Sequence, residues 1–206
     1  MVKSKLQLGL TAGIVLGVLV VDQLIKIAVK TTMCLHEHIR IADWFYIYFT
    51  ENNGMAFGWQ FFDKIFLTLF RLIAVVLIFI FVRKSIRRGA NTGFIVCLAM
   101  IIAGAAGNII DCLFYGQIFS ESTPYEVAQF VPFGTGYQEL FYGRVVDMFY
   151  FPLFEFDWPS WMPVVANEHF IFFSPIFNFA DSSISVGVVL LLLFYRNSLN
   201  KHFNEK

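Results

Sequence analysis

Long apolar runs alternate with polar connections along this chain, and four runs are long enough to form membrane-spanning helices. A helix that crosses the hydrocarbon core of a bilayer needs about 20 mainly apolar residues. The four runs cover about residues 6–29, 65–82, 93–111 and 175–195. The pattern therefore predicts an all-α integral membrane protein with four transmembrane helices, folded as a single membrane domain over residues 1–206.

Basic residues predict the orientation of these helices. Lys and Arg gather before the first run, between the second and third runs, and after the fourth: Lys3, Lys5, Arg83, Lys84, Arg87, Arg88, Arg196 and Lys201. Such residues are enriched in cytoplasmic connections. We therefore expect both termini in the cytoplasm, and the two long connections, at about residues 30–64 and 112–174, outside.

Three of the four runs carry polar pairs, and all three pairs lie at the same predicted depth. Each pair lies about one turn apart on one helix face, near the outer end. The pairs are Asp22 with Lys26, Asn108 with Asp111, and Asn178 with Asp181. One such residue alone is more often a helix cap, an interfacial residue or part of a surface ion pair. Charges deep in a bilayer are costly, so a deep charged residue is more often functional. The agreement among three helices predicts one polar site between them, near the outer surface.

The outer connections contain two further candidate residues. The stretch "WFYIYFT" (Trp44–Thr50) alternates aromatic and apolar residues as a strand does, and "NNG" after it indicates a turn at Gly54. Asn52 is then either an ordinary turn residue or an amide that binds a substrate backbone. Asp147 lies in an apolar, β-prone stretch, where a carboxylate is exposed, paired or functional.

Aromatic residues are dense in the second long connection. They indicate either contact with the lipid headgroups or the buried core of a small outer subdomain. The residues are Phe151, Phe154, Phe156, Trp158 and Trp161.

Composition narrows the function classes. The chain is 58% hydrophobic with 26 Phe residues and a net charge of zero, which is typical of a membrane protein and gives no indication of nucleic-acid binding. Its three cysteines form no CxxC pair, which argues against a thiol oxidoreductase, and pairing of Cys34 with Cys112 stays open. The four histidines show no metal-ligand spacing, so we expect no metal and no cofactor.

Paired aspartates are the remaining candidates for chemistry. Two close carboxyls share one proton, so the ionised one can take a proton from water while the other hydrogen-bonds the scissile carbonyl and later protonates the leaving amine. The candidates are Asp22, Asp111, Asp147 and Asp181. Asp181 is favoured by its partly desolvated place at a helix start, but spacing alone does not identify its partner. A non-enzymatic membrane protein that binds a lipid or an ion is the alternative.

Five short motifs, in order along nearly the whole chain, carry a family resemblance. They are "DQLIK" (Asp22–Lys26), "NNGMAFG" (Asn52–Gly58), "GAAGNIID" (Gly104–Asp111), "GRVVDMF" (Gly143–Phe149) and "FNFADSSI" (Phe177–Ile184). The sequence resembles the bacterial lipoprotein signal peptidases, or type II signal peptidases, which are intramembrane aspartyl proteases.

The resemblance implies a catalytic dyad of Asp147 and Asp181. It implies that the other motif residues line or brace the substrate pocket, namely Asp22, Lys26, Asn52, Gly54, Asn108, Asp111 and Asn178. It further implies a metal-free endopeptidase that cleaves prolipoproteins before a diacylglyceryl-modified cysteine. The expected setting is a multi-pass protein of the inner (cytoplasmic) membrane, in contact with membrane lipids and monomeric, with a small β-cradle and the active site on the extracytoplasmic side.

The chain departs from the family pattern at two places. Cys112 stands where the family usually has an arginine, and Arg144 is a candidate to supply the missing cation. Residues Cys112–Tyr142 also form a much longer connection than the family usually has, which could serve as a lid, a partner surface or added membrane contact.

Overall fold

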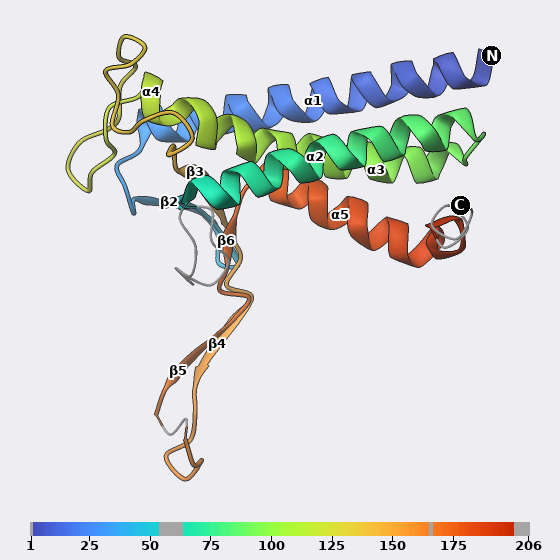
Figure 1. The fold of residues 1–206 in the computed structure, drawn as a ribbon. Coiled ribbons are helices and arrows are strands. Elements are labelled where there is room, and N and C mark those ends of the chain that lie inside the picture. The colour runs from blue at the N-terminus through green and yellow to red at the C-terminus, as the bar shows by residue number, and fades with distance from the viewer. Residues whose placement is uncertain (1, 54–63, 165–166, 200–206) are drawn as a thin grey trace.

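Helices that run side by side form the body of the protein (Figure 1). The computed structural model describes residues 2–53, 64–164 and 167–199. The helices of the body are α1 (Val2–Thr32), α2 (Lys64–Arg87), α3 (Thr92–Ile110) and α5 (Phe179–Phe194). Among the described residues, α1, α2 and the continuous helix from Thr92 to Ile118 are long and apolar enough to cross a membrane, whereas α5 is a shorter apolar helix of 16 residues.

Helix α3 continues beyond its regular part without a break. A π-helical turn, η2 (Asp111–Tyr115), follows it, and the short helix α4 (Gly116–Ile118) follows that turn. The start of α1, the turn between α2 and α3, and the end of α5 lie at one end of the bundle, and the sheet lies at the other (Figure 1). This arrangement agrees with the predicted grouping of the basic residues at one membrane face.

The fourth predicted helix begins later than the hydropathy indicates. The apolar run begins at residue 175, but Ile176–Phe177 form strand β6 and the helix α5 begins at Phe179. Asn178 caps α5, because its side-chain oxygen accepts a hydrogen bond from the Asp181 backbone N–H at 2.9 Å. An Asn at this position satisfies a backbone donor that has no partner within the helix, which fixes where the helix starts.

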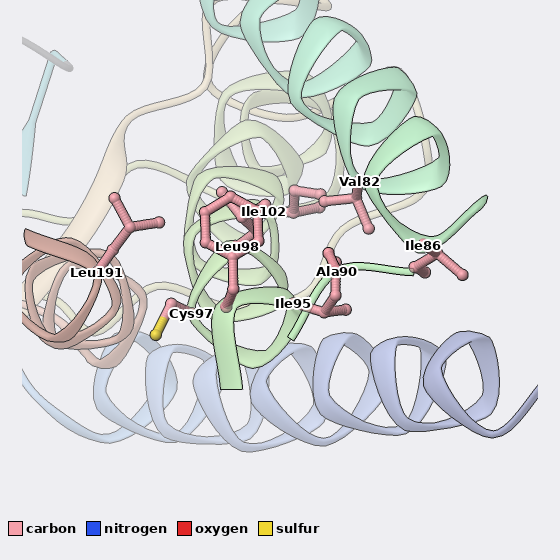
Figure 2. Close-up of a cluster of buried hydrophobic side chains, with 9 residues drawn as sticks. Val82, Ile86, Ala90, Ile95, Cys97, Leu98, Ile102 and Leu191 are labelled. Atoms are coloured by element: carbon pink, nitrogen blue, oxygen red, sulfur yellow. The ribbon is translucent and has the colours of Figure 1, made fainter. Parts of the chain in front are cut away.

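Helix α3 lies at the centre of the bundle. Figure 2 shows Val82 and Ile86 of α2 on one side of it and Leu191 of α5 on the other, around Leu98 and Ile102 of α3. The helices approach closely where α3 has glycine: a Cβ on Gly104 would lie 2.2 Å from the Ala180 carbonyl oxygen of α5. Small residues permit such backbone contact between membrane helices.

A four-stranded antiparallel sheet covers the end of the bundle opposite the termini. Its order is β1 (His38–Ala42), β2 (Phe45–Asn52), β3 (Val145–Tyr150), β6. The predicted strand at residues 44–50 is thus confirmed as β2, and the β-prone stretch around Asp147 is β3. Thr50 of β2 pairs with Asp147, and Phe149 of β3 pairs with Phe177 of β6, so the sheet connects Asp147 directly to the start of α5.

The long second connection is ordered into two parts. Residues 119–144 pack beyond the end of α3, where Phe119 joins a buried cluster with Tyr115 and Phe49. A separate hairpin of β4 (Phe154–Asp157) and β5 (His169–Phe172) projects from the sheet (Figure 1). All three cysteines are free, so Cys34 and Cys112 do not pair.

Candidate active site

A network of buried polar side chains lies where the helices meet the sheet, and it includes all three predicted polar pairs. Lys26 is at its centre. Its Nζ lies 3.0 Å from Asp22 Oδ2 and 2.8 Å from Asp111 Oδ2, and all three side chains are fully buried. Lys26 thus pairs with carboxylates from two different helical segments. This excludes the alternative that Asp22 and Lys26 form only an ion pair on the surface of α1.

The two carboxylates around Lys26 also hold backbone groups of neighbouring elements. Asp22 Oδ1 accepts a hydrogen bond from the Ala180 N–H at 2.9 Å, which ties α1 to the first turn of α5. Asp111 Oδ2 accepts one from the Val146 N–H at 3.3 Å, which ties the end of α3 to β3. The charged trio of Asp22, Lys26 and Asp111 therefore fixes the positions of the elements that carry Asp147 and Asp181.

Gln23 belongs to the same network, although sequence reasoning did not single it out. Its Nε2 donates to Asp111 Oδ1 at 2.9 Å, and its Oε1 accepts from the Tyr115 hydroxyl at 3.1 Å. The signal was present, because Gln23 is a polar residue within an apolar run and lies inside the first quoted motif.

Two asparagines connect the two candidate catalytic carboxylates. Asn178 Nδ2 donates to Asp147 Oδ1 at 2.6 Å, and Asn108 Nδ2 donates to Asp181 Oδ1 at 2.7 Å. The asparagines also bond to each other, because Asn178 Nδ2 lies 3.1 Å from Asn108 Oδ1. That same Asn108 oxygen accepts from Lys26 Nζ at 2.8 Å, so the amide bridge is anchored on the charged trio.

Asp147 and Asp181 lie in different environments. Asp147 is only 3% exposed, and Asp181 is half-buried. Burial, and next the negative charge of Asp181, raise the pKa of Asp147 to about 7, whereas hydrogen bonds from Asn178 and Asn52 oppose the rise. The pair therefore combines one buried carboxyl whose pKa is raised into the neutral range with one that is half-buried.

The second predicted motif is only partly within the described chain. Asn52 ends strand β2 and hydrogen-bonds to Asp147. Gly54 lies outside the described residues, so its predicted turn is not described. In the parts of the chain that the structure describes, no group of three His, Cys, Asp or Glu residues is placed to hold a metal ion.

A second buried charge cluster lies next to the site. Lys30 pairs with Glu51 of β2, and its Nζ also lies 2.8 Å from Ser122 Oγ, in residues 119–144. Glu51 in turn pairs with Arg144 at 3.1 Å. Sequence reasoning missed this cluster, although Lys30 follows Lys26 by one helical turn on the same face, which is a usable signal.

The cation near Cys112 comes from a different element than predicted. Arg144 forms ion pairs with two glutamates, with Nη1 3.1 Å from Glu51 and Nη2 3.1 Å from Glu121. The guanidinium of Arg71, on α2, instead lies against Cys112, with Nη1 3.9 Å from Sγ. The structure therefore places Arg71, the one charged residue of the second apolar run, next to the position where the resemblance implies an arginine.

Comparison with known proteins points to one family. The family model described as signal peptidase (SPase) II matches residues 14–196. The chain is 50% identical to the lipoprotein signal peptidase of Porphyromonas gingivalis strain ATCC 33277 over 96% of this chain and 88% of the relative. It is 34% identical to that of Amoebophilus asiaticus strain 5a2 over 92% of this chain and 78% of the relative. The chain belongs to the signal peptidase II family.

Solved structures share the fold. A bacterial membrane enzyme solved by the in meso method at 1.9 Å resolution matches with a TM-score of 0.57 and 24% identity, over 91% of this chain and 94% of that one. The likeness shows a membrane enzyme fold that combines several long apolar helices with strands.

Proposed function

We propose that this protein removes signal peptides from prolipoproteins by hydrolysing the bond before the diacylglyceryl-modified cysteine, with Asp147 and Asp181 as its catalytic dyad. Membership of the signal peptidase II family supports the reaction class. The amide bridge supports the dyad, because each carboxylate accepts a hydrogen bond from one of two asparagines that are bonded to each other.

The two aspartates have separate roles in the proposed reaction. The half-buried Asp181 carboxylate takes a proton from the attacking water, whose oxygen adds to the scissile carbonyl carbon. Asp147, protonated, hydrogen-bonds the carbonyl oxygen and then gives its proton to the leaving amine as the C–N bond breaks. The dyad ends with one proton on Asp181, which returns to Asp147 before the next cycle.

The neighbouring polar residues position this dyad. Asn108 and Asn178 each orient one oxygen of a dyad carboxylate for the reaction. Asp22, Lys26 and Asp111 brace the asparagines from behind. Asn52 contacts Asp147 at the rim, and together with Gly54 it is proposed to bind the substrate backbone.

The proposed setting is the bacterial inner membrane, crossed by α1, α2, α3 and α5 with both termini in the cytoplasm. The basic residues at one end of the bundle support this orientation, and the site then lies at the extracytoplasmic face. There the diacylglyceryl chains can stay in the bilayer while the peptide bond meets water. The enzyme is proposed to act as a monomer in contact with membrane lipids, without metal or cofactor.

Purified protein in lipid, mixed with three forms of one prolipoprotein, tests the reaction. The forms are the diacylglyceryl-modified substrate, the unmodified substrate, and a variant with serine at the lipobox cysteine. We expect a gel shift with the modified form alone, unchanged by a chelator. Cleavage of all three forms would contradict the proposed substrate class, and loss of cleavage in chelator would contradict a metal-free mechanism.

A further inference from the structure

The hairpin of β4 and β5 has two chemically different faces. Phe154 pairs across the strands with Phe172 and Phe156 with Phe170, with ring centroids 4.6 and 5.2 Å apart. Trp158 extends this group, because its ring lies 4.9 Å from that of Phe156. Successive strand residues point to opposite faces, so these rings form one aromatic face.

The opposite face of the hairpin is mostly polar, with Ile171 as its apolar member opposite Glu155. Glu155 and Asp157 alternate with the phenylalanines along β4. His169, opposite Asp157 in β5, lies with Nδ1 2.7 Å from Asp157 Oδ1 and Nε2 3.4 Å from Glu155 Oε2. The hairpin is therefore an amphipathic sheet of two strands, with aromatic rings on one side and an exposed charged cluster on the other.

Nothing in the described chain covers the aromatic face. Phe154 is 53% exposed, Phe172 44% and Phe156 38%, which excludes the alternative of a buried aromatic subdomain for these residues. Within the described residues, β4 and β5 pair with each other and with no third strand. A two-stranded hairpin on its own is marginally stable in water at best, so this one needs another surface against its rings.

The place of the hairpin indicates what that surface is. It leaves the sheet end of the bundle and runs across the direction of the helices, away from the body (Figure 1). If the helices cross the membrane, such a hairpin extends along the membrane surface at the level of the outer helix ends. Aromatic residues concentrate at this level, where a ring can contact acyl chains while polar groups stay in water.

We propose that the β4–β5 hairpin is an interfacial anchor whose aromatic face lies on the outer-leaflet lipids and whose polar face meets water. The helices of the bundle also expose apolar side chains, among them Val186 and Val189 of α5, so the anchor would add to a lipid-facing surface that the bundle already has. The anchor would hold the sheet, and with it β3, at a fixed height above the bilayer. The proposal concerns the location of the hairpin and does not depend on the dyad.

Spin labels on adjacent residues of opposite faces test the anchor. Full-length protein with Cys34→Ser receives either Phe156→Cys or Glu155→Cys, while the two remaining native cysteines are buried. In liposomes, we expect the ratio of oxygen to nickel-chelate collision rates to be several-fold higher at position 156 than at 155. Equal, water-like ratios would overturn the proposal, and so would spin–spin broadening at 156, which would mean that a second copy covers the face.

A native reporter keeps the test valid if Phe156→Cys disturbs the hairpin. With Trp44, Trp59 and Trp161 replaced by Phe, Trp158 is the remaining tryptophan of the four. Lipids brominated near the headgroup end of their acyl chains are expected to quench its fluorescence strongly. Absence of quenching, together with a water-like emission maximum, would overturn the anchor whether or not the protein cleaves its substrate.

Discussion

Replacing Lys26 by methionine removes the charge at the centre of the site while keeping the length of the side chain. The Nζ group lies 3.0 Å from Asp22 and 2.8 Å from Asp111, and all three side chains are fully buried. The variant leaves two carboxylates buried together without a cation. Removing one partner of a buried ion pair costs about 3–5 kcal/mol, and we expect Lys26→Met to lower the free energy of unfolding by about that amount.

Reversible unfolding by SDS in mixed micelles measures this loss. Lys5→Met is the matched control, because Lys5 is exposed on the same helix, and it should change stability by less than about 0.5 kcal/mol. Adding Asp22→Asn to Lys26→Met removes one of the stranded charges, so the double variant should recover part of the loss. If Lys26→Met is no less stable than Lys5→Met, the charged trio does not brace the helices.

Four further results are expected. Because burial and the charge of Asp181 raise the pKa of Asp147 to about 7, kcat should fall about tenfold per pH unit above about pH 7, and a profile flat to about pH 9 would refute its role as the acid. The pKa of Asp147 is higher in the folded protein, at about 7, than the ordinary value of 3.8, so folding favours the protonated form. The contribution of Asp147 to stability should therefore decline between about pH 4 and 7 in a pH series of melting curves. Gly104→Val places atoms against the Ala180 carbonyl and should cost about 1–3 kcal/mol, whereas Gly13→Val, which faces open space, lacks this clash; equal melting temperatures would argue against the close helix contact. Cys34, the half-buried cysteine, should be labelled by maleimide in the native protein while the two buried cysteines are not, and mass spectrometry that finds more than one label would contradict the described packing.

Hydropathy predicted the long apolar helices because it reflects the transfer of side chains between water and lipid, and helix spacing predicted which polar pairs gather at one end of the bundle. Helix geometry correctly places Asp22 and Lys26 on one face, and likewise Asn108 and Asp111. The start of α5 was missed because Ile176 and Phe177 are as apolar as the helix that follows, and a local cap at Asn178 sets the boundary.

Residue spacing alone could not identify the proposed partner of Asp181. Asp147 comes from a strand in the outer connection, and its approach to α5 depends on the pairing of β3 with β6, which alternation alone does not define. The family resemblance implies Asp147 as the partner, and the amide bridge supports that proposal. The cluster of Lys30, Glu51 and Arg144 depends likewise on contacts between three distant segments.

The most direct test of the account is cleavage of a diacylglyceryl-modified prolipoprotein by Asp147→Asn and Asp181→Asn, side by side in lipid. Asp157→Asn, in the exposed hairpin, is the control, and melting temperatures confirm that each variant is folded. The account predicts wild-type cleavage by the control and none above background by either dyad variant. A folded Asp147→Asn or Asp181→Asn protein that cleaves at the wild-type rate would contradict the dyad.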